Sequence, residues 1–453
     1  MQRQAKATQM SGISDPSQPL ATPSQRGGER AFAAPRTNGS DAQKAIITEF
    51  LGQARLSLTS KLDRFIQLRI NSRRDKFMSG RKNERDILKR KLKAGQNIHM
   101  PAPRRIGKTW TINRLAEDMR REGWLIVELD VQGMSAPDKF ARRLCQKIQN
   151  QLPTPSGLHA AFKNRLHALI GGNWGTDPIN VIGQVDPVSF LDALLEALAK
   201  EDKQSAIFVD EIAYFVLRFA ERNEGDAKDF FYELRNLQAE YSNIRWLFTG
   251  SIGLNFVAER FGLGGAFVDL TTFILEPFDE AEARSFLRDP ATQMGFNHQF
   301  HASDEDLKVL FEELGWLAPY YLKLVGNEVR PSGPEQDGRL TAKQEDLQDA
   351  MEKLLEPTRK SEFAVWREHI DKNLPQTDRD LARGVLGPLS AAADGETLDT
   401  LQAAMVPATP KAVRDILDIL QSDGLIDLTK GTKGRYRFRS GLIRRYWQQY
   451  EAD

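Results

Sequence analysis

The stretch Ala102-Pro-Arg-Arg-Ile-Gly-Lys-Thr109 decides the fold class, because it stands between a short apolar strand and a helix. It fits the pattern G-x-x-x-x-G-K-[ST], with Ala102 in place of the first glycine. In this pattern the glycine before the lysine lets the backbone approach phosphate oxygens at a helix N-terminus. Lys108 then reaches the β- and γ-phosphates, and the Thr109 hydroxyl binds Mg²⁺. The stretch therefore predicts a phosphate loop for ATP and Mg²⁺, whose binding residues are Ala102, Pro103, Arg104, Arg105, Ile106, Gly107, Lys108, Thr109 and Trp110.

Two carboxylates follow a second apolar strand, in Ala206-Ile-Phe-Val-Asp-Glu211. An acid at the carboxyl end of a strand beside a phosphate loop can hold the Mg²⁺ shell, so we expect Asp210 to share the metal with Thr109. The adjacent Glu211 can orient or deprotonate an attacking water. The alternative for such a pair is an ordinary helix cap.

A third strand ends in Leu247-Phe-Thr-Gly-Ser251. We expect the side chains of Thr249 and Ser251 to lie beside the Asp210 strand, where they can touch the γ-phosphate or the water. The alternative is a simple turn from strand to loop. The predicted catalytic residues are Glu211, Lys108, Asp210, Thr249 and Ser251.

The order of predicted elements favours an α/β fold. Apolar strands at 97–102, 124–131, 205–210, 244–249 and 267–275 alternate with helices at 109–121, 136–151 and 226–241. This alternation is typical of a parallel sheet covered on both faces. Beyond 279 the pattern is helical at 279–287, 304–314 and 319–329. Helices at 378–389, 397–405 and 409–424, followed by strands at 425–429 and 435–439, predict a winged helix.

A length of 453 residues predicts about three domains. Composition and periodicity divide the chain into six segments. These are a disordered tail at 1–41, a basic amphipathic helical arm at 42–76, an α/β core at 77–278, a helical lid at 279–330, a linker and helix at 331–376, and a winged-helix domain at 377–453.

From about Phe77 to Tyr450 the chain resembles the prokaryotic AAA+-like P-loop ATPases often called the archaeal ATPase family, which lie near the STAND NTPases and the Orc/Cdc6-like initiators. The resemblance rests on the phosphate loop and on Phe77-Met-Ser-Gly-Arg-Lys-Asn-Glu84, which looks like the family motif near the adenine. Asp130-Val-Gln-Gly133, the Asp210-Glu211 pair and Thr249-Gly-Ser-Ile-Gly253 follow in family order. Gly315-Trp-Leu-Ala-Pro-Tyr-Tyr-Leu322 looks like the family's lid, and Tyr436-Arg-Phe-Arg-Ser-Gly-Leu-Ile-Arg-Arg-Tyr-Trp447 like the end of its winged helix.

The resemblance implies a P-loop ATPase core of the ASCE/AAA+ type, with lid and winged helix, that hydrolyses ATP to ADP and phosphate. It places Gly80, Arg81 and Pro319 at the nucleotide. The chain departs from the family at two points. Thr249 or Ser251 stands where AAA+ proteins carry Asn, and Lys323 rather than an arginine follows Pro319. Arg218, Arg222, Arg235 and Arg260 are all candidates for a finger into a neighbouring subunit of a homo-oligomer.

Charge is balanced in total but uneven along the chain. Lys and Arg number 63 against 62 Asp and Glu, yet residues 51–110 hold 17 basic and 4 acidic residues, and residues 430–445 hold 7 basic residues and no acidic one. Such asymmetry suggests an anionic partner. The predicted wing and the basic arm would therefore contact DNA or RNA. A protein-docking winged helix, and an arm that is an ordinary packed helix with a solvated basic face, are the alternatives.

Several other classes are excluded. Cys145 is the one cysteine, which rules out an intramolecular disulfide and a cysteine-based zinc site. No stretch of 18 apolar residues exists, so we expect no membrane span and a cytoplasmic protein. Two functions fit. The first is an ATP-hydrolysing switch or motor that acts on nucleic acid. The second is a STAND-like signalling protein, for example in phage defence, whose bound nucleotide gates contacts with a protein partner.

Overall fold

The computed structural model describes residues 81–151, 164–165, 185–201, 203–251, 253–429 and 434–452, all of which lie in one unit of the chain, Asn71–Asp453. The tail and arm expected at 1–76, the nucleotide contact expected at Gly80, and the wing residues Lys430 and Lys433 lie outside the described residues. No described helix is long and apolar enough to cross a membrane.

A parallel sheet of five strands forms the centre of the α/β core, in the order β2-β3-β4-β1-β5. Its strands are β1 (Ile98–Pro101), β2 (Leu125–Asp130), β3 (Ser205–Asp210), β4 (Ile244–Gly250) and β5 (Thr271–Thr272). All four strand pairings are parallel, with Asp130 opposite Asp210 and Met100 opposite Thr249. The predicted α/β fold with a parallel sheet is confirmed. The last strand is much shorter than the expected 267–275, and a 3₁₀ turn (Gly264–Phe267) precedes it.

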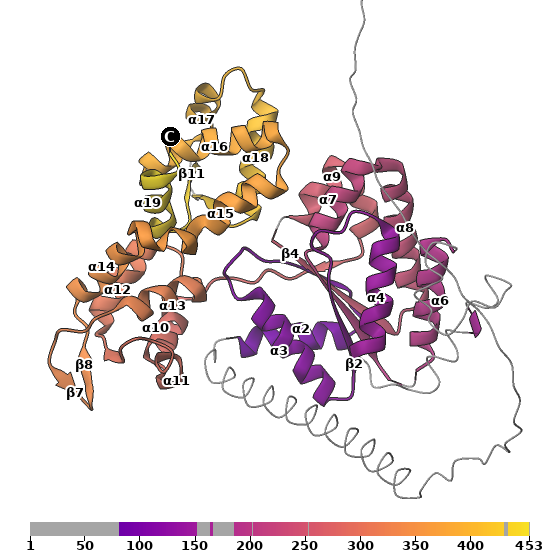
Figure 1. The fold of residues 1–453 in the computed structure, drawn as a ribbon, viewed down its shortest axis with the longest axis horizontal. Helices are drawn as coiled ribbons and strands as arrows, with labels where there is room; N and C mark the ends of the chain where they lie inside the picture. Colours follow the sequence, from indigo (N-terminus) through magenta and orange to yellow (C-terminus); the bar gives the residue numbers. More distant parts are fainter. Residues whose placement is uncertain are drawn as a thin grey trace, which may run out of the picture. The chain divides into compact units, whose positions relative to one another are not determined.

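Helices cover both faces of this sheet (Figure 1). Alternate residues of β3 point to opposite sides, so Ala206 and Phe208 pack with α2 (Lys82–Lys93) and α3 (Lys108–Arg121) in one buried cluster. Ile207 and Val209 pack in a second cluster with the helices of the other face. These helices are α4 (Pro137–Gln151), α6 (Pro187–Ala199), α7 (Ile212–Arg222), α8 (Glu224–Glu240) and α9 (Leu254–Arg260). Both faces are buried, as the uninterrupted apolar strands require.

A helical segment follows the sheet. It contains α10 (Glu280–Arg288), α11 (Pro290–Gln293), α12 (Asp304–Leu314), α13 (Pro319–Glu328) and α14 (Gln344–Leu354). Two short strands, β7 (Glu335–Gln336) and β8 (Arg339–Thr341), lie between α13 and α14, where the sequence suggested a linker. They form a small sheet with β6 (Phe300–His301), which precedes α12, in the order β6-β8-β7. Since α14 packs against α12 and α13, the helical segment continues past 330.

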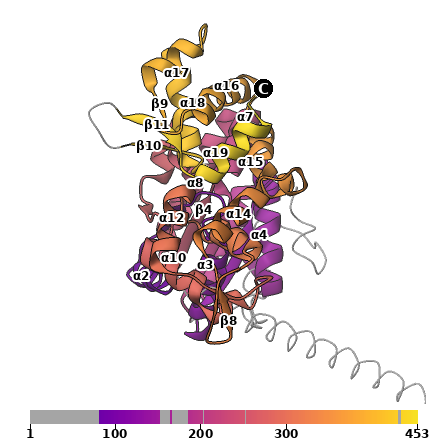
Figure 2. The ribbon, with the colours of Figure 1, turned by 90° about the vertical axis from the view of Figure 1, so that its left-hand side faces the viewer.

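The C-terminal segment combines helices with a three-stranded antiparallel sheet. A 3₁₀ turn (Pro357–Arg359) leads into α15 (Lys360–Asn373), α16 (Gln376–Ala391), α17 (Leu398–Ala404), α18 (Pro410–Ser422) and finally α19 (Gly441–Tyr450). The strands β9 (Glu396–Thr397), β10 (Ile426–Leu428) and β11 (Arg435–Phe438) pair in the order β10-β11-β9 (Figure 2). Helices α16 to α18 and this sheet lie where the sequence predicts the three helices and hairpin of a winged helix.

Candidate nucleotide-binding site

The loop between β1 and α3 has the backbone geometry of an anion cradle. Arg105 and Gly107 both adopt positive φ, 70° and 94°, and Gly107 is the N-cap residue of α3. Glycine adopts such angles without steric cost, whereas a non-glycine residue there is uncommon and is held by its surroundings. The loop therefore lies at the N-terminus of α3, where backbone N–H groups and the helix dipole favour phosphate oxygens.

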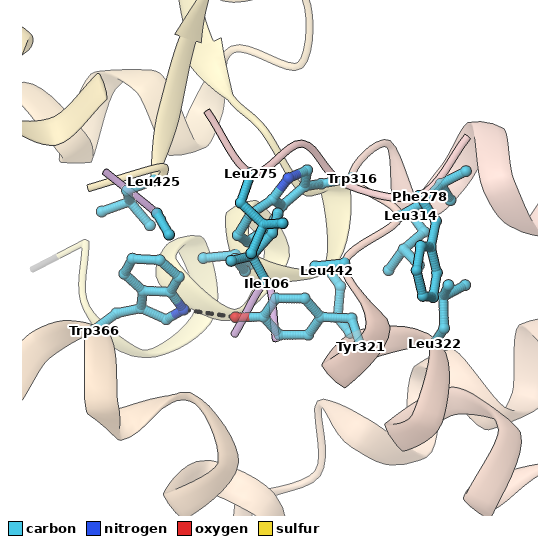
Figure 3. Close-up of a cluster of buried hydrophobic side chains, with 14 of the residues drawn as sticks. Ile106, Leu275, Phe278, Leu314, Trp316, Tyr321, Leu322, Trp366, Leu425 and Leu442 are labelled. Carbon is cyan, nitrogen blue, oxygen red and sulfur yellow. Dashed lines mark hydrogen bonds between the residues drawn. The ribbon is translucent and has the colours of Figure 1, made fainter. Parts of the chain in front are cut away.

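The underside of the loop is fixed by buried residues. Ile106 is fully buried and packs in the cluster that contains Leu275 and Phe278 (Figure 3). Arg81, only 1% exposed, donates from Nη2 to the Ile106 carbonyl at 3.1 Å, and its guanidinium lies 4.8 Å from the Phe278 ring centroid. Ala102, Ile106 and Arg81, all expected at the nucleotide, thus support the loop from below and do not line the pocket above it.

Lys108 is held between the two predicted acids. Its Nζ lies 2.7 Å from Asp210 Oδ1 and 2.6 Å from Glu211 Oε1. Burial lowers the pKa of Lys108, but Glu211 and Asp210 outweigh it and leave the pKa above its usual value. Burial likewise raises the pKa of Asp210, but the Lys108 ammonium and hydrogen bonds hold it below the usual range. Lys108 and Asp210 are therefore both charged at neutral pH.

The tips of β3 and β4 complete this arrangement. The Thr249 hydroxyl donates to Asp210 Oδ1 at 2.5 Å. Glu211 has a left-handed backbone, with φ 60°, and its Oε2 accepts from the Ser251 backbone N–H at 3.1 Å and the Ser251 hydroxyl at 3.0 Å. The structure thus brings all five predicted catalytic residues together. A non-glycine residue in the left-handed region is often found at functional sites.

A pocket of about 460 Å³ opens above the loop, and most of the predicted nucleotide contacts line it. These residues are Pro103, Arg104, Arg105, Gly107, Lys108, Thr109, Trp110 and Pro319, and the predicted catalytic residues Glu211 and Ser251 line the pocket with them. Lys323, the base that follows Pro319, lines it as well. The pocket therefore lies between the phosphate loop and the helical segment, and its wall is basic and aromatic.

Tyr320 and Val365 also line the pocket, although the sequence analysis did not select them. The Arg105 guanidinium stacks on the Tyr320 ring at 3.9 Å from the centroid, and the Tyr320 hydroxyl donates to Glu362 Oε2 at 2.7 Å. Burial and this hydrogen bond raise the pKa of Tyr320 to about 12. The aromatic pair Tyr320-Tyr321 after Pro319 was the signal in the sequence that could have predicted this contact, since an aromatic ring beside a basic loop suits a cation–π interaction.

The residues expected at the metal also meet. Thr109, Asp210 and Thr249 line a second pocket of about 190 Å³, together with Glu128 and Asp130. One hydroxyl and one ionised carboxylate, completed by phosphate oxygens and water, suit Mg²⁺, which rarely uses an all-protein cage. Among the described residues no group of three or more His, Cys, Asp and Glu gathers as a metal cluster. The donor set thus fits a metal that arrives with a nucleotide.

Two of the four candidate finger arginines already have partners within the chain. Arg235 Nε lies 2.6 Å from Asp269, and Arg260 Nη1 lies 3.0 Å from Asp378. Neither these two nor Arg218 and Arg222 line the pocket above the phosphate loop.

Comparisons with known proteins bear on the fold. Residues 67–171 match the profile of a family described as an AAA-like domain. A Walker-type ATPase of Pyrococcus abyssi superposes with a TM-score of 0.55 at 14% identity, covering 81% of this chain and 95% of that one. The ORC2 protein of Aeropyrum pernix, in ADPNP–ADP complexes, gives 0.47 at 13% identity, with 83% and 96% covered. The ORC1 protein of the same organism, in complex with DNA, gives 0.37 at 13% identity, with 82% and 92% covered. No curated protein shows significant sequence similarity to the chain.

The sheet, the phosphate loop and the first of these structural matches define the class of the protein. It has the α/β fold of the AAA+ P-loop ATPases. The family match covers 67–171, so the helical and C-terminal segments are assigned below on their own residues.

Proposed function

We propose that the protein is an ATP-hydrolysing switch that binds ATP with Mg²⁺ between the phosphate loop and the helical lid. The observation that carries this is the position of Lys108, held within 2.7 Å of both predicted acids at the base of a basic pocket. A triphosphate would take over Lys108 as a partner, because charge-assisted hydrogen bonds to phosphate are strong. That exchange frees both carboxylates for their own roles.

In this proposal different residues bind the phosphates, hold the metal and accept the proton. Backbone N–H groups of the loop, Lys108 and Arg105 bind and orient the phosphates. Thr109 and Asp210 hold Mg²⁺, which supplies electrostatic stabilisation of the transferring phosphoryl group. Glu211, fixed by Ser251, accepts a proton from the water whose oxygen bonds to the γ-phosphorus as the bond to the ADP oxygen breaks. ADP and phosphate are the products.

Hydrolysis is tested by Glu211→Gln, which keeps the shape of the side chain and removes the base. We expect turnover of ATP to fall about 100- to 10,000-fold, while ATP binding persists. Glu221→Gln, at an exposed position of the same helix α7, is the matched control and should turn over ATP like the wild type. If Glu211→Gln hydrolyses ATP at the wild-type rate, Glu211 is only the N-cap residue of α7.

We further propose that α16 to α18 and β9 to β11 form a winged helix that contacts DNA or RNA. Support comes from the basic hairpin, where Arg437 is exposed, whereas Arg435 and Arg439 donate to the backbone carbonyls of Gly395 and Ile426. We expect ATP turnover to rise with added duplex DNA or RNA. Binding should weaken as salt rises, because phosphate contacts release counterions. At a given salt concentration Arg437→Glu should bind nucleic acid more weakly than the wild type. Binding that does not depend on salt, or no binding at all, would remove nucleic acid as the partner.

A second candidate is a nucleotide-gated switch that acts on a protein partner, and α18 favours it. This helix carries Asp415 and Asp418, which line a pocket of about 440 Å³ together with Glu259 and Arg260 of the core helix α9. Ser422 at its end lies so close to Gly253 of the core that a Cβ there would be 3.0 Å from the Ser422 hydroxyl. Helix α18 carries Asp415 and Asp418 beside Lys411 and Arg414, and a helix packed in this way against the core is poorly placed for a DNA groove. This candidate predicts bound nucleotide after purification and no stimulation by nucleic acid.

Assembly into a homo-oligomer is a proposal that rests on the resemblance to AAA+ proteins. Light scattering with and without ATP and Mg²⁺ tests it directly. A mass that stays that of one chain under both conditions would remove the need for a finger arginine.

A further inference from the structure

Four polar side chains from four separate elements meet behind the phosphate loop. Arg104 Nε donates to His369 Nδ1, and His369 Nε2 lies 2.9 Å from Asp423 Oδ2. The Tyr214 hydroxyl lies 2.5 Å from His369 Nε2 and 3.1 Å from Nδ1. We call Arg104, Tyr214, His369 and Asp423 the buried histidine cluster. Tyr214, His369 and Asp423 are at most 4% exposed, so solvent does not satisfy their polar atoms.

The members of the cluster belong to parts of the chain that hold the site. Arg104 is in the phosphate loop and lines the nucleotide pocket. Tyr214 is in the first turn of α7, and its backbone N–H donates to the carbonyl of Glu211, the proposed base. His369 is on α15, and Asp423 ends α18. The imidazole of His369 therefore connects the phosphate loop, the first turn of α7 beside Glu211, and the C-terminal segment.

The protonation pattern follows from the donors. An arginine only donates, so Nδ1 of His369 accepts from Arg104, while Nε2 faces the Asp423 carboxylate. Burial and the Asp423 carboxylate raise the pKa of Tyr214, so its hydroxyl stays protonated. The cluster thus orders the side chain of Arg104 through a chain of hydrogen bonds that begins at Asp423.

Helix α15 lies against the phosphate loop along one face. Glu362, Val365 and His369 are spaced three and four residues apart, which places them on the same side of the helix. Glu362 accepts a hydrogen bond from the hydroxyl of Tyr320, on whose ring Arg105 stacks. Val365 lines the pocket, and His369 accepts a hydrogen bond from Arg104. Both arginines of the loop are therefore positioned, directly or through Tyr320, by α15.

Apolar packing joins the same parts. Gly424, next to Asp423, has φ +82°, and a Cβ there would lie 2.3 Å from Cβ of Pro103 in the phosphate loop. Leu425 follows in a buried cluster that includes Ile106 of the loop, Trp366 of α15 and Leu442 of α19 (Figure 3). In that cluster the Trp366 indole donates to the Tyr321 hydroxyl at 2.7 Å. Packing of this density gives the end of α18 little freedom to shift independently of the loop.

We propose that His369 and Asp423 are positioning residues for the nucleotide site, which hold Arg104 toward the phosphates and couple nucleotide binding to the docking of the end of α18. This rests on the proposed function, since it requires that the pocket binds ATP. Coupling is reciprocal, so a residue outside the pocket that favours nucleotide binding must itself be stabilised when nucleotide binds.

The test compares affinities for a non-hydrolysable ATP analogue with Mg²⁺ by calorimetry, in two pairs of variants. Asp423→Ala and His369→Ala break the cluster, and we expect each to weaken binding about 5- to 100-fold. Asp423→Asn keeps an acceptor and His369→Gln keeps an acceptor and a donor, so both should restore most of the affinity. Asp378→Ala removes the Arg260 ion pair between the core and α16, which has no link to Arg104, and should bind like the wild type.

A second readout separates positioning from simple stabilisation. In the wild type we expect the analogue to slow amide hydrogen exchange at 416–424, and in His369→Ala this slowing should be lost. Folded alanine variants that bind the analogue with wild-type affinity would overturn the inference alone. A wild-type protein that binds no analogue would overturn the proposed function instead, so the two failures are distinct.

Discussion

At the scale of single residues, Lys108 is the centre of the site. It has two carboxylates within 2.7 Å, which leaves the trio with one excess negative charge when all three are ionised. The ion pairs stabilise the site, and they also compete with a triphosphate for the same ammonium group. In the proposed function, nucleotide binding would therefore release Asp210 and Glu211 from Lys108.

The pKa directions predict how this trio contributes to stability at different pH. The pKa of Asp210 is lowered, so its contribution is present above its ordinary value of 3.8 and is lost as pH falls through the depressed value. The pKa of Lys108 is raised, so its contribution is complete below 10.5 and is lost as pH rises through the elevated value. The stabilisation should therefore be constant across the neutral range.

Denaturant unfolding of the wild type and Lys108→Met measures this contribution. We expect the variant to be less stable by about 2 kcal/mol between about pH 5 and pH 9, less than for a fully buried pair because the Asp210 side chain is 27% exposed. Below pH 3.8 the difference should narrow, since protonation removes the unpaired carboxylate of the variant. A difference that grows as the pH falls would contradict the assigned ion pairs.

At the scale of elements, strand order explains what could be predicted from the sequence. Lys108 follows β1, and Asp210 and Thr249 lie at the carboxyl ends of β3 and β4, which a parallel sheet brings to one edge. A local pattern and one topological rule were enough to predict that they meet.

The buried histidine cluster could not be predicted in this way. Tyr214, His369 and Asp423 belong to helices or helix ends, and they meet only because α15 packs on the phosphate loop. No local pattern encodes that contact. Helix α7 was also missed, because the apolar run 212–217 fits a buried strand as well as a helix.

Helix α16 offers a test of packing at the element scale. Gly387 is interior to the helix, and a Cβ at this position would meet no atom within 4 Å other than its chain neighbours and the backbone of the helix. Gly387→Ala should therefore raise the free energy of unfolding by less than the full helix-propensity gain of about 0.5–1 kcal/mol, because the Cδ of the following Pro388 crowds the new Cβ. Gly384→Ala gains the same helix propensity, but its Cβ would lie 2.7 Å from the Met405 sulfur. We expect the Gly384 variant to be the less stable of the two in thermal unfolding. The reverse order would contradict the packing of Met405, which follows α17, on α16.

At the scale of the whole described unit, the buried apolar residues form two separate clusters. One contains only residues of the α/β core, from Leu125 to Ala266, on the face covered by α4 and α6 to α9. The other extends from α2 and α3 through the helical segment to α19, and it includes Ile106 beneath the phosphate loop. The candidate nucleotide site therefore lies on the cluster that joins the core to the C-terminal segment.

Two matched leucines distinguish the clusters. Leu442 in α19 and Leu195 in α6 are both fully buried, one in each cluster. Replacement of either by alanine should cost about 2–5 kcal/mol of stability. Only Leu442→Ala should also weaken ATP binding, measured by calorimetry at a temperature where both variants are folded. Equal ATP affinity in the two variants would show that the C-terminal segment does not support the site.

The most direct test of the central claim is the affinity for ATP with Mg²⁺ of the wild type and Lys108→Met. Lys89→Met, which removes an ion pair with Glu122 outside the pocket, is the control. We predict that the wild type and the control bind alike. Lys108→Met should bind at least about tenfold more weakly, as expected for the loss of a hydrogen bond to a charged group. An affinity of Lys108→Met equal to that of the wild type would contradict the phosphate loop and the function built on it.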